Sequence, residues 1–504
     1  MMELSGKDLT ISDVVRVSRF KETVGLSEKA KKKIEAARSV VENAARSDKA
    51  TYGINTGFGA LATIKVGPED LLDLQRNLLL SHACGVGKAA PEEVVRAMML
   101  LRANSLSCGF SGVRIALVEK LIEFLNKNVI PYIPEKGSVG CSGDLAQLAH
   151  MSLPLIGEGY VLEKGVRVPA PEALKKAKIE PLTLVEKEGL SLINGTQAMT
   201  ARLCLAVNDA LNALWFATHV AALTTDVLLG SPDAFDEGIQ KARPHPGQAL
   251  VSSWLREDLR GSEIRESHRN CPKVQDAYSL RCIPQVHGAA LDTINYAVSV
   301  IEREINSATD NPLVVENRII SGGNFHGEPV ALIADFLAIA MTDVGNMVER
   351  RIDRLLNPKT NENLPDFLAS GKRGINSGYM IWQYTAAALC NENKVLSHPA
   401  STDSIPTSAY QEDHVSMGMN SCLKLDKVID NFLTLVSIEL MTACRALEFR
   451  RPLRSSVRNE ELYQQVKPFM KRTNQDDFLM NQFEAIRNLV FNKVRNPFDE
   501  VFER

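Results

Sequence analysis

The feature that most constrains the fold of this chain is a set of long segments rich in alanine and leucine. The first covers residues 190–229, and polar side chains such as Asn208, His219 and Asp226 interrupt it. A membrane-spanning helix rarely tolerates so many polar groups, whereas a helix buried among other helices can pair them. We therefore predict a core helix, largely covered by its neighbours, over this segment.

Three more segments have a similar composition, at residues 285–308, 328–356 and 425–447. Pro312 and Pro358 lie just beyond two of them, as expected for residues that follow a helix end. Long helices of this kind bury their apolar stripes by packing side by side. The pattern predicts an all-α protein built on a long-helix bundle, with a short β-type run at residues 159–168 on its periphery.

The composition excludes several function classes. The formal net charge of the 504 residues is -3, and no long run of one sign indicates nucleic acid or a membrane as a partner. The nine cysteines include no Cys-x-x-Cys pair and the chain has no His-Glu-x-x-His motif, so no metal site is predicted. An odd number of cysteines and a start without an apolar signal core favour reduced thiols and a cytoplasmic location.

The run at residues 137–146 contains the tripeptide Cys141-Ser142-Gly143, which is able to carry out unusual backbone chemistry. The amide nitrogen of Gly143 can attack the carbonyl carbon of Cys141 and close a five-membered ring, a close approach that glycine permits. Loss of two waters then leaves a methylene conjugated to a carbonyl, which is an electrophile. Taken alone, such a tripeptide more often marks a tight turn, here before Asp144 at a helix N-terminus. A nucleophile elbow is disfavoured because it needs glycine at position 144.

Six separated motifs resemble those of the aromatic amino acid ammonia-lyases, in the order of that family and through nearly the whole chain. They are Tyr52-Gly53-Ile54-Asn55-Thr56-Gly57-Phe58-Gly59, residues 137–150, Asn194-Gly195-Thr196-Gln197, Gln275-Asp276-Ala277-Tyr278-Ser279-Leu280-Arg281, Thr309-Asp310-Asn311-Pro312 and Gln411-Glu412-Asp413-His414-Val415-Ser416-Met417. The resemblance implies an all-α fold of the fumarase/aspartase-like superfamily. A mainly helical N-terminal domain at residues 1–195 would carry the prosthetic loop, and residues 196–504 would form the long-helix bundle and a C-terminal helical region.

In that family the loop becomes 4-methylidene-imidazol-5-one, so the resemblance implies that Cys141, Ser142 and Gly143 form this group and that no external cofactor is needed. An electrophile bonded to the substrate amine improves a poor leaving group, and a base must then remove the β-proton. The resemblance gives this acid–base role to Tyr52, whose pKa of about 10 must be tuned by its surroundings. It also assigns catalytic roles to Asn194, Tyr278 and Glu412.

The resemblance also implies how the substrate is recognised. A planar guanidinium such as that of Arg281 matches a carboxylate, although a helix cap or a surface ion pair is an equal reading of this residue alone. The pairs Ser81-His82 and Gln411-Glu412 follow the histidine-type members, and an imidazole ring needs polar partners. The implied substrate-binding residues are His82, Asn194, Gln275, Arg281, Phe325, Gln411 and Glu412.

Within the family, the chain is most similar to the histidine lyases, which convert L-histidine to trans-urocanate and ammonia. The family also implies a homotetramer whose sites draw residues from several subunits. The sequence departs from the common pattern at Cys141 (usually alanine), Gln147 and Ala277 (often proline) and Tyr410 (usually asparagine). Ring closure uses only the carbonyl of Cys141, whereas Tyr410 lies next to the Gln411-Glu412 pair and bears on the substrate.

Three alternatives remain open at this point. A tyrosine or phenylalanine ammonia-lyase, or a 2,3-aminomutase, would share the prosthetic group. A member of the fumarase and aspartase group would carry a different serine loop, which is not visible in the sequence. A non-catalytic helical scaffold would have no reason to keep its site residues, Tyr52, Ser142, Asn194, Arg281 and Glu412.

Overall fold

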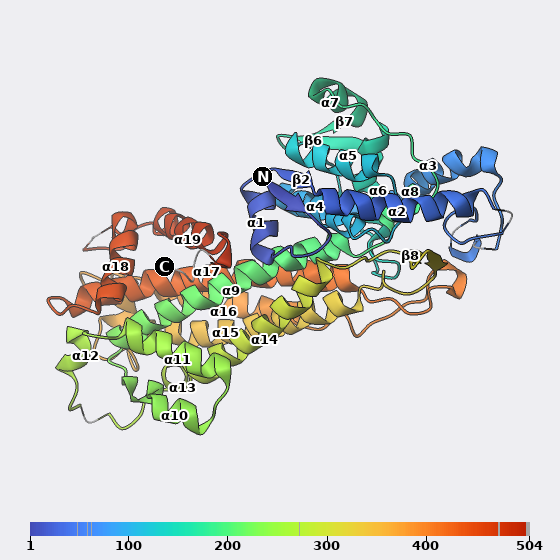
Figure 1. Cartoon of the computed structure of the whole chain (residues 1–504). Coiled ribbons are helices and arrows are strands. Elements are labelled where there is room, and N and C mark those ends of the chain that lie inside the picture. The colour runs from blue at the N-terminus through green and yellow to red at the C-terminus, as the bar shows by residue number, and fades with distance from the viewer. Residues whose placement is uncertain (48, 58, 62, 272, 472–473, 500–504) are drawn as a thin grey trace. The chain divides into compact units, whose positions relative to one another are not determined.

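The computed structural model describes residues 1–499 except 48, 58, 62, 272 and 472–473, and most of them are helical (Figure 1). Phe58 of the first motif therefore lies outside the described residues. The chain forms two compact units. Unit 1 consists of Met1–Ala206, Val298–Asp335 and Pro399–Leu423, and unit 2 of Val207–Ala297, Phe336–His398 and Lys424–Arg504.

Four long helices each contribute to both units. They are α9 (Gln197–Val227), α14 (Ile283–Glu304), α15 (Glu328–Leu356) and α17 (Gly418–Arg450). They correspond to the four alanine- and leucine-rich segments, and the all-α fold is confirmed. Because the unit boundary falls inside these helices, each unit combines three stretches of chain. The split into residues 1–195 and 196–504 stays a prediction.

The first of these segments differs from its prediction in one respect. Helix α8 (Glu188–Ile193) ends before Asn194, and α9 begins at Gln197, so residues 190–229 do not form one helix. Asn194 leaves the helical conformation, with φ -87° and ψ 97°. The interruption exists because Gly195 pairs with Gly143 of the prosthetic loop, a tertiary contact that alanine and leucine content cannot reveal.

Unit 1 surrounds the segments of the candidate site with short helices and small sheets. Its helices are α1 (Ile11–Arg19), α2 (Glu28–Ala45), α3 (Leu71–His82), α4 (Glu92–Ser107), α5 (Ile115–Asn126), α6 (Leu145–Ser152), α7 (Ala170–Ala177) and α8. Its strands are β1 (Met2–Leu4), β2 (Val24–Leu26), β3 (Val86–Ala89), β4 (Ile130–Pro131), β5 (Pro134–Lys136), β6 (Tyr160–Glu163), β7 (Val166–Pro169), β8 (Leu313–Val315) and β9 (Arg318–Ile320). The β-type run at residues 159–168 forms the antiparallel pair β6–β7, with Val161 opposite Val168.

Local sequence explains where these helices start. Thr10 precedes α1, and its hydroxyl accepts from the Asp13 amide while the Asp13 carboxylate accepts from the Thr10 amide. This reciprocal capping satisfies two amides that the first helical turn leaves unpaired. Helix α4 is buried almost throughout, from Val94 to Ser107, which makes it the central helix of unit 1.

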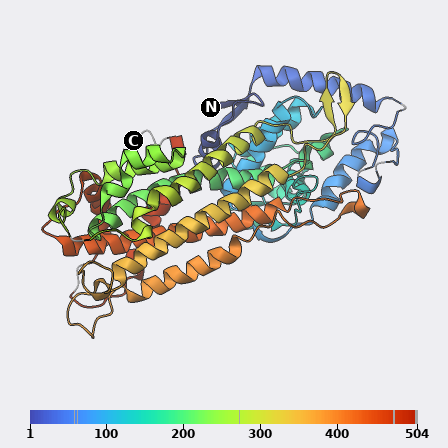
Figure 2. The same ribbon diagram turned by 90° about the horizontal axis from the view of Figure 1, so that it is seen from below.

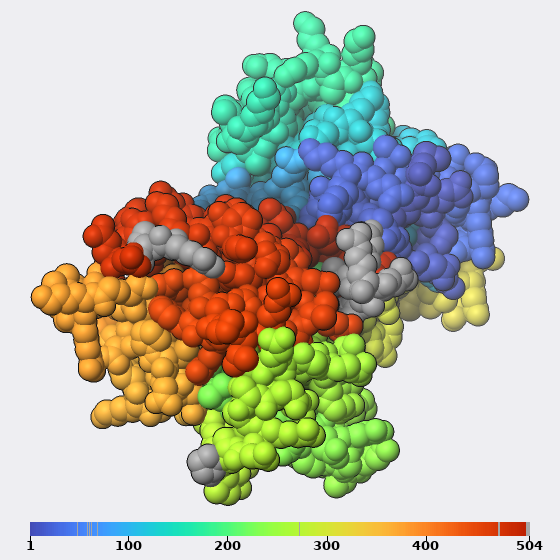
Figure 3. Space-filling view, turned by 90° about the vertical axis from the view of Figure 1, so that its left-hand side faces the viewer, coloured from blue at the N-terminus to red at the C-terminus, as the bar shows by residue number. Residues whose placement is uncertain are grey.

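Unit 2 is a bundle in which α9, α14, α15 and α17 run side by side with α16 (Met380–Leu396), as both ribbon views show (Figures 1 and 2). Its shorter helices are α10 (Glu237–Ala242), α11 (Pro246–Asp258), α12 (Glu263–Ser267), α13 (Tyr278–Arg281), α18 (Val457–Val466) and α19 (Met480–Val494). On the molecular surface, the red C-terminal residues adjoin the yellow-green region of α10–α12 (Figure 3).

One helix of the described residues, α15, is long and apolar enough to cross a membrane by length and composition alone. In the structure, 61% of its most apolar stretch is buried against other parts of the chain. This burial is typical of a core helix, because such helices are covered by protein on most sides.

Candidate active site

The prosthetic loop approaches the start of α9 more closely than any side chain would allow. Gly143 pairs with Gly195, and the Asp144 amide donates to the Gly195 carbonyl at 2.7 Å. A Cβ at Gly143, where φ is +70°, would lie 1.9 Å from the Gly195 carbonyl oxygen. Glycine is therefore required at position 143 for conformation and for space.

The Asp144 side chain holds this contact in place through its hydrogen bonds. Its side chain is fully buried, and it accepts from the Ser138 hydroxyl at 2.7 Å and from the Met199 amide at 2.8 Å. Burial raises the pKa of this carboxyl to about 6, although both donors pull it the other way. The turn-and-cap reading of residues 137–146 is partly right, because α6 follows directly, but Asp144 serves the tertiary contact rather than capping its own helix.

The other side of the loop rests on the segment after Glu412. The Ser416 hydroxyl donates to the Gly140 carbonyl at 3.1 Å, and the Met417 amide donates to the Val139 carbonyl at 2.8 Å. Cys141 is buried against Val415 and Met417. Burial raises the pKa of the Cys141 thiol to about 12, so this thiol stays protonated and acts as a small apolar side chain.

Ser142 and Glu412 meet across 270 residues of chain. The Ser142 hydroxyl donates to Oε1 of Glu412 at 3.1 Å. The other carboxylate oxygen, Oε2, accepts from the Thr407 hydroxyl at 2.8 Å. Both carboxylate oxygens of Glu412 thus have a hydrogen-bond partner, and one of these partners is Ser142.

Three further titratable groups of unit 1 lie near enough to Glu412 for its charge to raise their pKa values. They are Tyr52, His82 and Cys141. Burial lowers the pKa of His82 while the charge of Glu412 partly opposes this, so the ring is neutral at neutral pH. The Ser81 hydroxyl lies 3.0 Å from Nδ1 of His82, and the ring also bonds to the Leu78 backbone.

Tyr52 differs from expectation in the direction of its pKa. Burial raises it above the ordinary value, and the charges of Glu412 and Asp310 raise it further. The described residues of unit 1 therefore keep the Tyr52 side chain as an uncharged phenol, instead of lowering its pKa towards neutral pH. Both influences favour the uncharged form, because a phenolate here would be poorly solvated and close to carboxylates.

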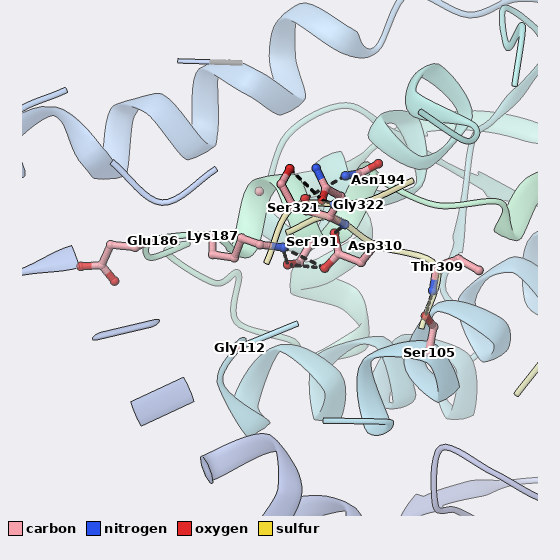
Figure 4. Close-up of polar contacts among 12 residues, drawn as sticks. Ser105, Gly112, Glu186, Lys187, Ser191, Asn194, Thr309, Asp310, Ser321 and Gly322 are labelled. Atoms are coloured by element: carbon pink, nitrogen blue, oxygen red, sulfur yellow. Dashed lines mark hydrogen bonds and ion pairs between the residues drawn. The ribbon is translucent and has the colours of Figure 1, made fainter. Parts of the chain in front are cut away.

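Asn194 is oriented by the Thr309-Asp310-Asn311-Pro312 motif (Figure 4). Its side-chain nitrogen donates to the Asn311 carbonyl at 2.9 Å, whereas its Oδ1 is buried and has no partner among the described residues. The amide orientation is secure because the reverse would place two oxygens together. The Asn311 side chain is itself held, since its Oδ1 accepts from Ser321 and Gly322.

Asp310 of this motif belongs to a buried group of three charged residues with Lys187 and Arg102, of which Figure 4 labels Lys187 and Asp310. The Lys187 ammonium lies 2.8 Å from the Asp310 carboxylate, which also accepts from the Ser191 hydroxyl at 3.0 Å. Arg102 is fully buried, donates to Gln197 Oε1 at 2.8 Å and to the Ser191 carbonyl, and adds its charge to the same region. Burial alone would raise the pKa of Asp310, but the charges of Lys187 and Arg102 outweigh it and lower that pKa.

The remaining predicted residues show no contact of this kind. Phe325 is half-buried and Gln411 is exposed, both in unit 1. Gln275, Tyr278 and Arg281 belong to unit 2. There the Arg281 guanidinium lies over the Tyr278 ring, 4.6 Å from its centre, and Tyr278 is 68% exposed. Among the described residues, no three histidine, cysteine, aspartate or glutamate side chains are grouped as metal ligands would be.

The sequence reasoning missed Thr407, Lys187 and the role of Asp310. Asp310 lies in a motif that was recognised, so its position was marked although its partners were not. Neither Thr407 nor Lys187 carries a sequence signal, because their importance comes only from partners placed by the fold.

Comparisons with known proteins agree with this geometry. The family profile described as aromatic amino acid lyase matches residues 9–468. A histidine ammonia-lyase of Caldanaerobacter subterraneus subsp. tengcongensis is 53% identical over 466 residues, 92% of this chain and 91% of the relative. Among solved structures, histidine ammonia-lyase from Trypanosoma cruzi superposes with a TM-score of 0.90 at 39% identity, covering 98% of this chain and 95% of that one. Tyrosine aminomutase from Streptomyces globisporus gives a TM-score of 0.93 at 36% identity, with 98% and 97% covered.

Proposed function

Because the chain belongs to the aromatic amino acid lyase family, we propose that it is a carbon–nitrogen lyase that converts L-histidine to trans-urocanate and ammonia. The histidine assignment rests on 53% identity across nearly the whole chain to a histidine ammonia-lyase, against 36% to the tyrosine aminomutase. The pocket residues agree with it, since His82 and Glu412 offer the polar partners that an imidazole ring requires.

The observation that carries the proposal is the hydrogen bond of Ser142 to Glu412, next to the pairing of Gly143 with Gly195. The residues fit a 4-methylidene-imidazol-5-one made from Cys141, Ser142 and Gly143. The glycine backbone is close-packed, and the buried Oδ1 of Asn194 lacks a donor among the described residues. Once formed, this group supplies an electrophile that turns the substrate amine into a leaving group.

The side chains of unit 1 bind the substrate and move its proton. Neutral His82 presents Nε2 to the imidazole ring, and the Oε1 atom of Glu412 accepts from a ring N–H. Tyr52 is the proposed acid–base residue at the β-carbon. Because its surroundings raise its pKa, it acts as a base only where a nearby positive charge lowers that pKa.

In unit 2, the Arg281 guanidinium is the proposed partner of the substrate carboxylate. Its Nε is buried and without a hydrogen-bond partner among the described residues, and its plane is supported by the Tyr278 ring. A planar donor fixed in this way grips a carboxylate at two points. Gln275 precedes this pair in the same motif and joins the proposed substrate contacts.

We also propose a cytoplasmic homotetramer with shared sites. The surface of α16 supports an oligomer, because only Ala386 and Asn393 of its 17 residues are buried. Ile381, Tyr384 and Val395 of this helix are 54%, 59% and 70% exposed. A long helix that leaves such side chains uncovered is typical of a surface that packs against another protein.

Intact mass tests the prosthetic group directly. Ring formation expels two waters, so the purified chain is expected to weigh about 36 Da less than its sequence predicts. Ser142→Ala removes the hydroxyl that becomes the methylene and is expected to fold without the second dehydration and without activity. Cys141→Ala is the matched control and is expected to keep the full deficit. An active wild type of unmodified mass would refute the mechanism.

Product analysis separates lyase from aminomutase. Histidine is expected to yield urocanate and ammonia in equal amounts, with little cinnamate from phenylalanine and no β-amino acid from any substrate. Preferential turnover of tyrosine, or a β-amino acid product, would replace the histidine assignment while leaving the family unchanged.

A further inference from the structure

The segment Thr407–Glu412 closes on itself directly before the candidate active site. The Thr407 amide donates to the Glu412 carbonyl at 2.8 Å, and the Glu412 amide donates to the Thr407 carbonyl at 3.3 Å. These two bonds place the residues opposite each other as an antiparallel pair. Side chains of directly opposite residues lie on the same face and within reach of each other.

The turn between them is left-handed over three successive residues that are not glycine. Ser408, Ala409 and Tyr410 have φ values of 50°, 53° and 67°. Left-handed conformation is unfavourable for each such residue, and runs of it persist only where the surrounding structure imposes them. Strain of this kind concentrates at functional sites, which directs attention to what the turn holds in place.

The turn is held from two sides. The Gln411 amide donates to the Ser408 carbonyl at 3.0 Å, which closes the turn internally. Gly59, at the end of the Tyr52 motif, packs so closely that a Cβ there would lie 2.7 Å from the Ser408 hydroxyl oxygen. The Tyr52 motif and the turn therefore support each other.

The result of this arrangement is a fixed carboxylate. The Thr407 hydroxyl donates to Oε2 of Glu412 at 2.8 Å, and Oε1 is left to receive the Ser142 hydroxyl at 3.1 Å. A hydrogen bond to a carboxylate is stronger and more directional than one between neutral groups. Without it, the flexible glutamate side chain has other rotamers available.

We propose that Thr407 is a positioning residue of the lyase: its hydroxyl holds Oε2 of Glu412, so that Oε1 faces Ser142 and the substrate ring. The left-handed turn keeps Thr407 opposite Glu412. This inference rests on the proposed function and extends it, because the sequence motifs mark Glu412 but not Thr407.

The hydroxyl is separable from the fold of the loop. The backbone bonds between Thr407 and Glu412 already close the segment, and none of them uses the Thr407 side chain. Valine has nearly the shape of threonine and the same preference for extended backbone. Thr407→Val therefore removes the bond to Glu412 and leaves the backbone pair intact.

The experiment compares three variants with wild type for histidine turnover and for intact mass. Thr407→Val is expected to lower kcat/KM about ten- to hundredfold, the loss typical of one bond to a charged group. Thr407→Ser keeps the hydroxyl and is expected to stay within about threefold of wild type. Thr402→Val is the matched control, because among the described residues the Thr402 hydroxyl donates to the Pro399 carbonyl alone, and it is expected to leave turnover unchanged.

All variants are expected to keep the mass deficit of about 36 Da, because the prosthetic loop is untouched. The positioning role is overturned if Thr407→Val turns over histidine within about threefold of wild type, or if Thr407→Ser is as impaired as Thr407→Val. It is also overturned if Thr407→Val loses the mass deficit, since Thr407 then acts on maturation. A wild type that makes no urocanate overturns the proposed function instead.

Discussion

The buried charges of Arg102, Lys187 and Asp310 make a quantitative prediction about stability. Arg102 and Asp310 are 0% and 1% exposed, and Lys187 is 1% exposed, so two cations and one carboxylate share a buried region. Replacing Asp310 by asparagine removes the one anion among them and leaves two cations facing each other. Replacing Lys187 by methionine leaves Asp310 with Arg102, Ser191 and its own backbone donor from Asn311.

These two substitutions are therefore expected to lower the free energy of unfolding by different amounts. Breaking a buried pair and stranding its charge costs about 3–5 kcal/mol, and Asp310→Asn is expected at the upper end. Lys187→Met removes the ammonium's hydrogen bonds to Asp310 and Ser191 without stranding an anion, at about 1.5–3 kcal/mol. For a chain of 504 residues, each kcal/mol lowers the thermal midpoint by about 1 °C, if unfolding entropy scales with length.

Thermal unfolding of the intact protein at one fixed concentration measures this order. We expect midpoints that fall from wild type to Lys187→Met to Asp310→Asn. Asp226→Asn is the matched control: Asp226 is buried and bonded to Ser262 and Ser455, and burial raises its pKa although those hydroxyls oppose this. Because the cations that interact with its charge, Arg265, His268 and Arg450, are only half-buried, its loss is expected to cost less. A midpoint for Lys187→Met at or below that of Asp310→Asn would refute the charge balance.

Three further predictions concern recognition, pH and backbone strain. His82→Leu is expected to lower kcat/KM for histidine by roughly 5- to 150-fold, by leaving a ring nitrogen unpaired, with an unchanged mass deficit; unaltered histidine kinetics would remove His82 from the pocket. Burial raises the pKa of Asp144 from 3.8 to about 6, so the folded chain binds a proton between these values that the unfolded chain has lost. Stability therefore rises by up to about 3 kcal/mol as pH falls through this window, of which about 1.4 kcal/mol is gained by pH 5. Thermal midpoints at pH 7.5 and pH 5 should show this smaller gain in wild type but not in Asp144→Asn. Tyr410→Asn is expected to raise the free energy of unfolding by about 0.5–1 kcal/mol, and the thermal midpoint slightly, by relieving left-handed strain. Turnover is expected to stay unaltered because the Tyr410 side chain is 81% exposed. A changed substrate preference would show that this side chain reaches the substrate.

The sequence was sufficient for the long helices and for the family, but not for the contacts that shape the site. The alanine- and leucine-rich composition predicted α15 (Glu328–Leu356) with both ends correct, because a helix that is buried on most sides is rich in apolar residues. Composition did not reveal the interruption at residues 194–196, although Asn194 and Gly195 fit a turn, since it depends on Gly143 reaching Gly195 across the fold.

The candidate site shows the same division. The motifs marked Ser142 and Glu412, and the structure brings them together. They did not mark Thr407, whose hydroxyl matters only because a left-handed turn sets it opposite Glu412. The direction of the Tyr52 pKa was also beyond the sequence, because it follows from burial and from carboxylates contributed by distant segments.

The three-part construction of unit 1 has a consequence for how the protein is made. The residues that brace the prosthetic loop from one side, Glu412 and Ser416, belong to its last stretch, Pro399–Leu423. A ribosome delivers the chain from the N-terminus, so Cys141-Ser142-Gly143 emerges long before these residues do. The loop is complete only in a nearly finished polypeptide. In the proposed mechanism, ring closure in this loop would therefore have its support from Glu412 and Ser416 only after most of the chain has been synthesised.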